Sequence, residues 1–270
     1  IKNMKDLKTF ERNTKIQKAI KFATKTHEVY DKQKRKGKDV AYITHPLTVG
    51  LIISSVTDDN DIVCAGILHD TIEDSIPEKK VDFNMLKERF GKRVAQMVLD
   101  VTEQDKSLSW EIRKKQAIEH IGSMTNHSLL LKSADIISNL SELIEDYDKE
   151  GEIIFDRFNA PKDKKIKNDL RTINAIVSKW SDNPFKDHLT YLAYRLQMIG
   201  ATSFMPAHPA DIIEYDDYDE NKKLECPICN WQGSAKESQN INTDSHFCMD
   251  VSCPICDKML LVVNYAQIKS

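Results

Sequence analysis

The sequence of 270 residues has little of what marks fibrous, secreted or membrane-spanning proteins. Its 8 Gly and 8 Pro are too few for a collagen-like or low-complexity chain. No apolar run approaches the roughly 20 residues that cross a bilayer, and the first residues lack the apolar segment of a secretory signal. We therefore expect a cytoplasmic protein. The formal net charge of -3 sets up no strong overall attraction to nucleic acid or to an anionic membrane.

Cysteine is also scarce, and its placement argues against a disulfide framework. Four of the 6 cysteines form two Cys-Pro-Ile-Cys pairs near the end of the chain, Cys226 with Cys229 and Cys253 with Cys256. In a reducing compartment such pairs bind metal, and four thiolates close a tetrahedral structural Zn²⁺ site. The sequence therefore predicts a zinc ribbon that the metal folds and that has no catalytic role.

Apolar residues at three- and four-residue steps predict a largely helical chain before the cysteines. Helices are expected over residues 16–30, 46–53, 61–71, 83–90, 94–102, 109–121, 127–147, 164–180 and 189–199. No strand-rich stretch interrupts them. We predict an all-α domain over residues 1–205, an acidic linker over 206–223 and the zinc ribbon over 224–270.

The helix expected over residues 61–71 is nearly all apolar and carries a pair of titratable side chains, His69 and Asp70. Charge is costly there without a partner, although a buried His or Asp alone is more often a hydrogen-bonded core residue. Glu73 and Asp74 follow four residues after His69 and Asp70, one turn along if the helix continues. Four such groups would repel one another without a cation. We interpret them as part of a divalent-metal site, with Glu73 and Asp74 facing bound water.

Two distant residues are candidates to complete this ligand set. His45 stands at the start of a predicted helix, and Asp135 lies in a small and apolar helical segment. Mixed nitrogen and oxygen ligands suit Mn²⁺, Fe²⁺ or Zn²⁺ better than Mg²⁺. Sequence spacing alone does not bring these residues together.

Four motifs resemble the hydrolase domain of the RelA/SpoT family and occur in its order. They cover the stretch from about residue 16 to residue 180, and the compactness of the match is most similar to the small alarmone hydrolases, including the metazoan SpoT homologue. The motifs are Ala41-Tyr-Ile-Thr-His-Pro-Leu47, Ala65-Gly-Ile-Leu-His-Asp-Thr-Ile-Glu-Asp74, Val101-Thr-Glu103 with Asp105-Lys-Ser-Leu108, and Lys132-Ser-Ala-Asp-Ile-Ile-Ser-Asn-Leu140.

The resemblance implies a fold, a metal and a reaction. The fold is an all-α HD-domain helical bundle, and the reaction converts (p)ppGpp and water to GDP or GTP and pyrophosphate. Glu73 and Asp74 match the residues that assist catalysis by handling the attacking water, work worth roughly 10²–10⁴-fold in rate. The residues that match the Mn²⁺ ligands are His45, His69, Asp70 and Asp135.

Basic and polar residues near this centre are candidates for nucleotide contacts. The Arg35-Lys36 pair lies in a basic run just before Tyr42 and resembles the Arg-Lys of the family that contacts nucleotide. Tyr42 and Asn139 also match nucleotide-contacting positions, and Lys106 either reaches a phosphate or is simply exposed.

The last motif departs from the family pattern at Ile136, Ser138, Ser141 and Glu142, in the neighbourhood of the base. The hydrolytic residues are retained, so the reaction class is better supported than the substrate. Two alternatives therefore stay open: a phosphohydrolase for another nucleotide or for the 2′-phosphate of NADPH, and a nucleotide-sensing adaptor without catalysis.

Charge also bears on the partners of the C-terminal part. Residues 211–270 contain 11 Asp or Glu against 5 Lys, which opposes contact with nucleic acid phosphates. We expect a protein partner or self-association through the zinc ribbon instead, beside the guanine nucleotide substrate of the helical domain.

Overall fold

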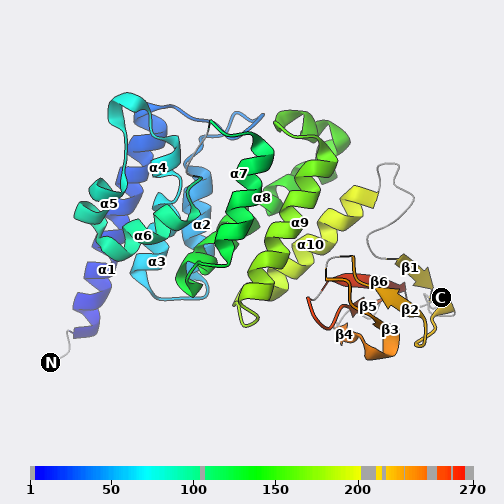
Figure 1. Ribbon diagram of the computed structural model, residues 1–270. Helices are drawn as coiled ribbons and strands as arrows, with labels where there is room; N and C mark the ends of the chain where they lie inside the picture. The colour runs from blue at the N-terminus through cyan, green and yellow to red at the C-terminus, as the bar shows by residue number, and fades with distance from the viewer. Residues whose placement is uncertain are drawn as a thin grey trace, which may run out of the picture. The chain divides into compact units, whose positions relative to one another are not determined.

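The structure is a computed structural model that describes residues 4–103, 107–201, 211–214, 217–227, 229–241, 248–256 and 258–264 (Figure 1). The chain divides into two compact units. The first comprises residues 1–161 and 182–189, and the second residues 162–181 and 190–270. Within the described residues, none of the helices combines the length and the apolar character that a bilayer crossing requires.

The first unit is helical, as the sequence predicts. Its helix α1 begins earlier than the apolar pattern suggested and continues directly into a π-helix, η1. The elements of this unit are α1 (Met4–Thr24), η1 (Lys25–Tyr30), α2 (Thr44–Ser54), α3 (Asn60–Leu68), α4 (Thr71–Asp74), η2 (Pro77–Lys79), α5 (Phe83–Phe90), α6 (Lys92–Val101), α7 (Trp110–Ile121), α8 (Asn126–Glu150) and η3 (Gly151–Arg157). The predicted all-α class of this part is confirmed.

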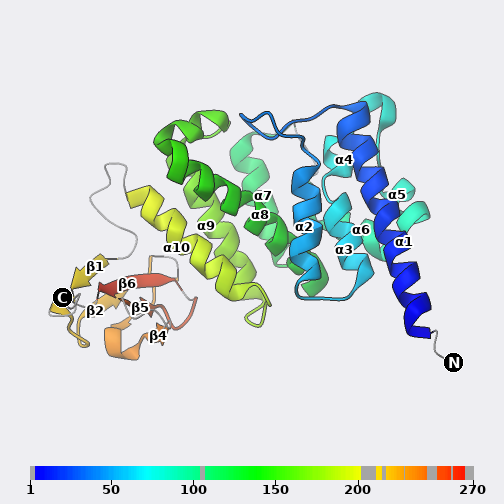
Figure 2. The same ribbon diagram turned by 180° about the vertical axis from the view of Figure 1, so that it is seen from behind.

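Helix α3 forms the centre of the first unit. Every residue from Ile62 to Leu68 is buried, because α3 packs against α1, α2, α6 and α8. Both views show α1, α2 and α3 lying side by side (Figures 1 and 2). A helix that is apolar on all sides must be covered on all sides, and the sequence pattern of α3 therefore determines its central place.

Two glycines allow α2 and α3 to approach closely. A Cβ atom on Gly66 would lie 2.6 Å from Cδ1 of Ile53 and 3.4 Å from the Cα of Gly50. A Cβ atom on Gly50 would lie 2.6 Å from Cγ1 of Ile67. A larger residue at either position would clash with Ile53 or Ile67 unless that side chain moved.

The helix predicted over residues 61–71 is interrupted in the structure. Helix α3 ends at Leu68, and the single turn of α4 starts at Thr71. The dihedral angles of Asp70, φ -90° and ψ -5°, depart from helical values, and the Thr71 hydroxyl donates to the Leu68 carbonyl over 2.7 Å. The pair His69-Asp70 therefore stands at a junction between two helices instead of on a continuous helix.

The second unit combines two helices with a small β module. Its elements are α9 (Lys162–Lys179), α10 (Lys186–Ala201, shared with the first unit), β1 (Asp211–Glu214), β2 (Lys223–Glu225), β3 (Gln232–Ser234), η5 (Ala235–Glu237), β4 (Gln239–Ile241), β5 (Cys248–Ser252) and β6 (Met259–Asn264). One sheet has the order β1-β6-β5-β4, and β2 with β3 forms a separate antiparallel pair. This β module around the cysteines agrees with the predicted ribbon.

Strand β1 lies inside the range predicted as an acidic linker. It pairs in parallel with β6, with Ile212 beside Val262 and Ile213 beside Val263. The two isoleucines precede the acidic run and supply the apolar residues that a strand needs, so only the later part of the range has linker composition. The domain boundaries at residues 205 and 223 stay a prediction.

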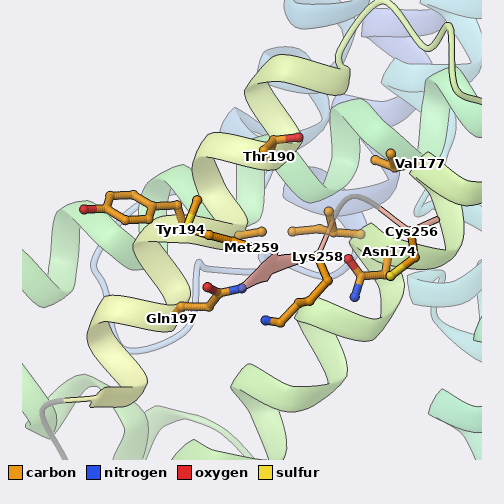
Figure 3. A pocket seen from close by; sticks show the side chains of 10 residues that line it. Asn174, Val177, Thr190, Tyr194, Gln197, Cys256, Lys258 and Met259 are labelled. Carbon is orange, nitrogen blue, oxygen red and sulfur yellow. The ribbon is translucent and has the colours of Figure 1, made fainter. Parts of the chain in front are cut away.

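A small cavity lies within the second unit, between α9, α10 and the start of β6 (Figure 3). Its volume of about 20 Å³ has room for about one water molecule. Gln197 and Lys258 line it and are both buried. Burial lowers the pKa of Lys258 to about 8, against the opposing effect of Cys226 and Cys256. This cavity is too small for a nucleotide.

The start of α3 yields a stability prediction. Asp59 caps the helix by accepting the Asp61 backbone N–H over 2.9 Å, and Arg93 donates to the same carboxylate over 3.0 Å. Burial raises the pKa of Asp59, but Arg93 and the backbone N–H of Asp61 outweigh it and leave this pKa below 3.8. A depressed carboxyl pKa contributes stability above the unfolded-state value, and this contribution is lost as the pH falls.

We therefore expect Asp59→Ala to lower the free energy of unfolding by about 1–2 kcal/mol near neutral pH. Denaturant unfolding at a series of pH values measures this, and the difference from wild type should shrink below pH 3.8. Asp59→Asn, which keeps the cap and loses the charge, is the matched control and should be less destabilising. A difference that is as large at pH 3 as at pH 7 would contradict the assignment.

Candidate metal centre

His45, His69, Asp70 and Asp135 meet in the first unit, where the start of α2, the α3–α4 junction and the middle of α8 come together. One potential ligand atom from each of His45, His69 and Asp70 lies within 4.8 Å of the other two. The His69 Nε2 atom is 3.0 Å from Asp70 Oδ2. Asp135 Oδ1 is 3.3 Å from His45 Nε2 and 3.7 Å from His69 Nε2. The four side chains thus point their ligand atoms at one small volume.

Hydrogen bonds on the far side of each imidazole determine which nitrogen faces this volume. His69 Nδ1 donates to the Gly66 carbonyl over 2.8 Å, because a carbonyl oxygen can only accept. His45 Nδ1 lies 2.9 Å from the Ser138 hydroxyl. The Nε2 atoms of both rings are therefore directed inward, and the ring centroids lie 5.0 Å apart.

The burial and charge of this cluster fit a divalent cation. Both histidines are only 3% exposed, and the inward Nε2 of His69, although 3.0 Å from Asp70 Oδ2, makes no hydrogen bond of good geometry with any of the described residues. Burial lowers the pKa of His69, but Asp70 and Asp135 outweigh it and raise this pKa well above 6.5. The pKa of Asp135 lies well below its usual range although burial opposes ionisation. The centre therefore favours positive charge beside two ionised carboxylates, as a metal ion would supply.

The Asp135 carboxylate accepts hydrogen bonds from two residues of its own helix, α8. Lys132 Nζ donates to Asp135 Oδ2 over 2.9 Å, and Asn139 Nδ2 donates to Asp135 Oδ1 over 2.7 Å. These residues stand one turn before and one turn after Asp135 on α8. Asn139 is a candidate from its resemblance to the family, whereas Lys132 was not predicted as a site residue. Its spacing of three residues from Asp135, which places both on one helical face, could have indicated this contact.

Glu73 and Asp74 lie on α4, at the edge of the centre. The Glu103 backbone N–H donates to Glu73 Oε2 over 3.3 Å, and the Asp74 backbone N–H donates to the Asp70 carbonyl over 2.9 Å. Burial is the largest cause that raises the pKa of Tyr42, and the charges of Asp70 and Asp74 add to it. The Asp74 carboxylate therefore lies within electrostatic reach of the Tyr42 hydroxyl.

Three of the expected nucleotide-contacting residues also lie at this centre. The Tyr42 hydroxyl donates to Asp70 Oδ2 over 2.6 Å, and the Arg35 guanidinium lies 5.5 Å from the Tyr42 ring centroid. Arg35 Nη2 donates to Asn139 Oδ1 over 2.9 Å and to Glu142 Oε2 over 2.5 Å. A chain of hydrogen bonds thus runs from Glu142 through Arg35 and Asn139 to the carboxylate of Asp135.

The other two expected contacts are Lys36 and Lys106. Lys36 Nζ lies 5.6 Å from the centroid of the Phe158 ring. Lys106 falls in the range 104–106, which lies outside the described residues. Their roles toward a substrate stay predictions.

The residues that depart from the family pattern have distinct surroundings in the structure. Ser138 is buried and bonded to His45, so its place is behind the imidazole. Glu142 pairs with Arg35 and also with Lys38 over 2.9 Å, while Ser141 is exposed. From the sequence, Ser138 was expected near the nucleotide base, because a linear motif does not show which face of the helix turns toward the histidine.

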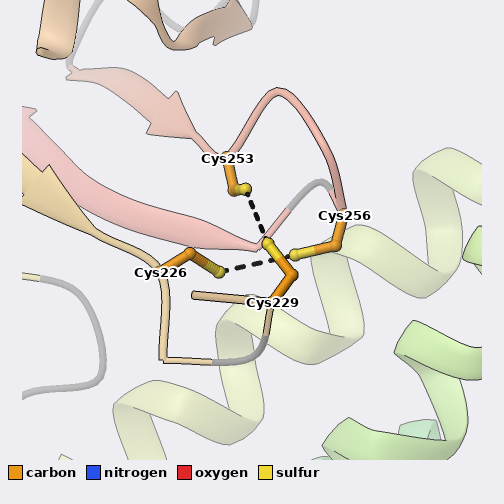
Figure 4. Close-up of side chains that lie close together, drawn as sticks. All are labelled: Cys226, Cys229, Cys253 and Cys256. Carbon is orange, nitrogen blue, oxygen red and sulfur yellow. Dashed lines mark hydrogen bonds between the residues drawn. The ribbon is translucent and has the colours of Figure 1, made fainter. Parts of the chain in front are cut away.

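The four cysteines of the second unit converge at the ends of β2 and β5 (Figure 4). The Sγ atoms of Cys226 and Cys256 lie 3.5 Å apart, as do those of Cys229 and Cys253. All four are free thiols. A tetrahedral site with metal–sulfur bonds of about 2.3 Å separates its sulfurs by roughly 3.8 Å, whereas a disulfide needs about 2.05 Å. The geometry therefore fits one metal ion and no disulfide.

Comparison with known proteins identifies relatives of the helical part. The HD domain family matches residues 19–160. The guanosine-3′,5′-bis(diphosphate) 3′-pyrophosphohydrolase MESH1 of Xenopus tropicalis is 35% identical over 132 residues, which are 47% of this chain and 69% of that protein. MESH1 of Danio rerio is 33% identical over 126 residues, 46% of this chain and 66% of that protein.

Longer and structurally known relatives match as well. The guanosine-3′,5′-bis(diphosphate) 3′-pyrophosphohydrolase of Aquifex aeolicus is 34% identical over 131 residues, but the match spans only 18% of its length. A solved structure of a metazoan orthologue of SpoT that hydrolyses ppGpp superposes with a TM-score of 0.52 and 22% identity. It covers 70% of this chain and 96% of the solved one, which shows a common fold.

The bond between Ser138 and His45 yields a prediction about metal affinity. Ser138→Ala removes the partner that orients the imidazole, so we expect divalent-metal binding to weaken by about tenfold. Calorimetric titration with Mn²⁺ measures this. Ser141→Ala, an exposed serine on the same helix, is the control and should bind as wild type does. Equal affinities of the two variants would mean that Ser138 does not orient His45.

Proposed function

The chain belongs to the HD domain family, and on that premise we propose that it is a metal-dependent phosphohydrolase of guanosine 3′-diphosphate alarmones. It would convert (p)ppGpp and water to GDP or GTP and pyrophosphate. The observation that carries the proposal is the convergence of two histidines and two aspartates beside Tyr42, Arg35 and Asn139. Curated relatives at 33–35% identity bear the name of this activity.

The metal ligands in this proposal are His45, His69, Asp70 and Asp135, and the expected ion is Mn²⁺. Imidazole nitrogens and carboxylate oxygens together favour a transition ion over Mg²⁺. When bound, such an ion lowers the pKa of a water ligand and polarises a phosphoryl oxygen. The cysteine cluster, with four soft thiolates, is proposed to hold a structural Zn²⁺.

Glu73 and Asp74 are the proposed catalytic pair. Hydrolysis forms a bond from a water oxygen to the phosphorus next to the ribose and breaks the bond from that phosphorus to the ribose 3′ oxygen. Glu73 would accept the proton that the water loses, Asp74 would orient the water, and the departing ribose 3′ oxygen would take up a proton from solvent water to become the 3′ hydroxyl. Support comes from their place on α4, directly after the ligand pair His69-Asp70. Positioned proton transfer of this kind contributes about 10²–10⁴-fold.

The proposed substrate contacts are Arg35, Tyr42 and Asn139 for the nucleoside, with Lys36 and Lys106 for phosphate. One observation supports a second candidate substrate. Glu142, one of the residues that depart from the family pattern near the base, is paired with both Arg35 and Lys38 and so changes the charge that a base would meet. Another nucleotide, or the 2′-phosphate of NADPH, is therefore the alternative substrate.

The location and partners of the chain are further parts of the proposal. Free cysteine pairs poised for metal suit a reducing compartment, which supports a cytoplasmic protein. The acidic composition of residues 211–270 supports a protein contact or self-association for the second unit and opposes a nucleic acid partner.

A substrate panel tests the function. The full chain with Mn²⁺ is given ppGpp, pppGpp, GTP or NADPH, and pyrophosphate and orthophosphate are measured separately. We expect pyrophosphate from ppGpp and pppGpp only. Orthophosphate from NADPH alone would favour the alternative substrate, and binding of ppGpp without any product would indicate an adaptor. Asp135→Asn, as control, should lose hydrolysis and bound Mn²⁺ while it keeps one Zn²⁺ per chain.

The role of Glu73 gives a separate prediction. Glu73→Gln keeps the shape of the side chain but cannot accept a proton at neutral pH, so turnover should fall at least about tenfold. Calorimetry should show the affinity for Mn²⁺ nearly unchanged. Wild-type turnover of this variant would make Glu73 a structural residue that fixes the Glu103 backbone.

A further inference from the structure

Lys132 lies beside the metal centre without being one of its ligands. Its ammonium donates to Asp135 Oδ2 over 2.9 Å, and its side chain is 23% exposed. Lys149, further along α8, also pairs with a carboxylate, that of Glu145, but there both side chains are exposed by more than half. The Lys132 pair is thus the more shielded of the two, and its charge acts with less screening by water.

The two carboxylate oxygens of Asp135 have different partners. Oδ1 lies 3.3 Å from His45 Nε2 and 3.7 Å from His69 Nε2, and it also accepts a hydrogen bond from Asn139 Nδ2 over 2.7 Å. Oδ2 accepts a hydrogen bond from Lys132 Nζ over 2.9 Å. A carboxylate fixed in this manner offers one oxygen to a metal ion, and rotation about its last bond would break the contact with Lys132. The orientation of Asp135 therefore depends on Lys132 at one oxygen and on Asn139 at the other.

The negative charge of the carboxylates at the centre is a second reason to assign a role to Lys132. The carboxylates of Asp70 and Asp135 lie at the centre, and Glu73 and Asp74 follow on α4, so that the four together carry more negative charge than one divalent ion neutralises. Lys132 Nζ lies 2.9 Å from Asp135 Oδ2, which places a positive charge directly beside one of these carboxylates.

We propose that Lys132 is a positioning residue of the metal centre, which holds Asp135 as a one-oxygen ligand and offsets the negative charge that the bound ion leaves uncompensated. The proposal rests on the metal-dependent function proposed above. It assigns Lys132 to the ion and not to the nucleotide, because Lys132 contacts the carboxylate of Asp135, a proposed metal ligand.

The test measures Mn²⁺ binding to the full chain by the electron paramagnetic resonance signal of free Mn²⁺. Lys132→Gln and Lys132→Met should raise the dissociation constant about 10–100-fold. Lys132→Arg, which keeps a charge and a donor, should stay within about threefold of wild type. Lys149→Gln, which removes the exposed pair of the same helix, should leave the constant unchanged.

Steady-state kinetics with ppGpp separates this role from a substrate contact. In Lys132→Gln, saturating Mn²⁺ should restore most of kcat, and KM for the nucleotide should remain within about twofold of wild type. A raised KM with an unchanged Mn²⁺ dissociation constant would overturn the proposal in favour of a phosphate contact. Failure of both neutral variants to fold without metal, seen by circular dichroism, would overturn it in favour of a purely structural ion pair.

The two proposals can fail independently. If wild type hydrolyses none of the nucleotides but the Mn²⁺ constants follow the expected order, the function is wrong and the role of Lys132 stands. If wild type hydrolyses ppGpp and the neutral variants bind Mn²⁺ as tightly as wild type, the role of Lys132 is wrong and the function stands.

Discussion

The first unit depends on keeping several buried acidic and imidazole groups within a few ångströms of one another. Asp135 is the most constrained of them, since it sits on a long helix among apolar residues and receives hydrogen bonds from Lys132 and Asn139. An unpaired carboxylate there would be costly, and each of its oxygens has a partner. The surrounding helices therefore support a polar centre whose charge is incomplete without a cation.

The backbone that supports this centre relies on close helix packing. Because Gly50 and Gly66 have no side chains, α2 and α3 approach closely enough to bring the rings of His45 and His69 to 5.0 Å. Helix α3 ends at Leu68 and α4 begins at Thr71, so that His69 and Asp70 lie between the two helices. The proposed metal ligands His69 and Asp70 are thus followed directly by the turn that carries the proposed catalytic pair.

The residues proposed to contact the nucleotide and those proposed to bind the metal share helix α8. Asn139 bonds to Asp135 and accepts from Arg35, and Arg35 is in turn held by Glu142. A substrate that displaced Glu142 from Arg35 would change the first of these hydrogen bonds. The pairing of Arg35 with Glu142 is therefore connected, through Asn139, to Asp135, a proposed metal ligand.

The sequence by itself determined the helical class, the central place of α3 and the two cysteine pairs, because apolar periodicity and ligand spacing are local properties of the chain. It also supplied His45, His69, Asp70 and Asp135 as candidates, but only resemblance linked them. Only the tertiary structure showed the contacts between residues far apart in the sequence. Ser138 bonds to His45, and β1 pairs with β6, because of which faces of distant segments meet. It also showed that the helix ends before His69-Asp70 and that Lys132 bonds to Asp135, which apolar periodicity does not predict.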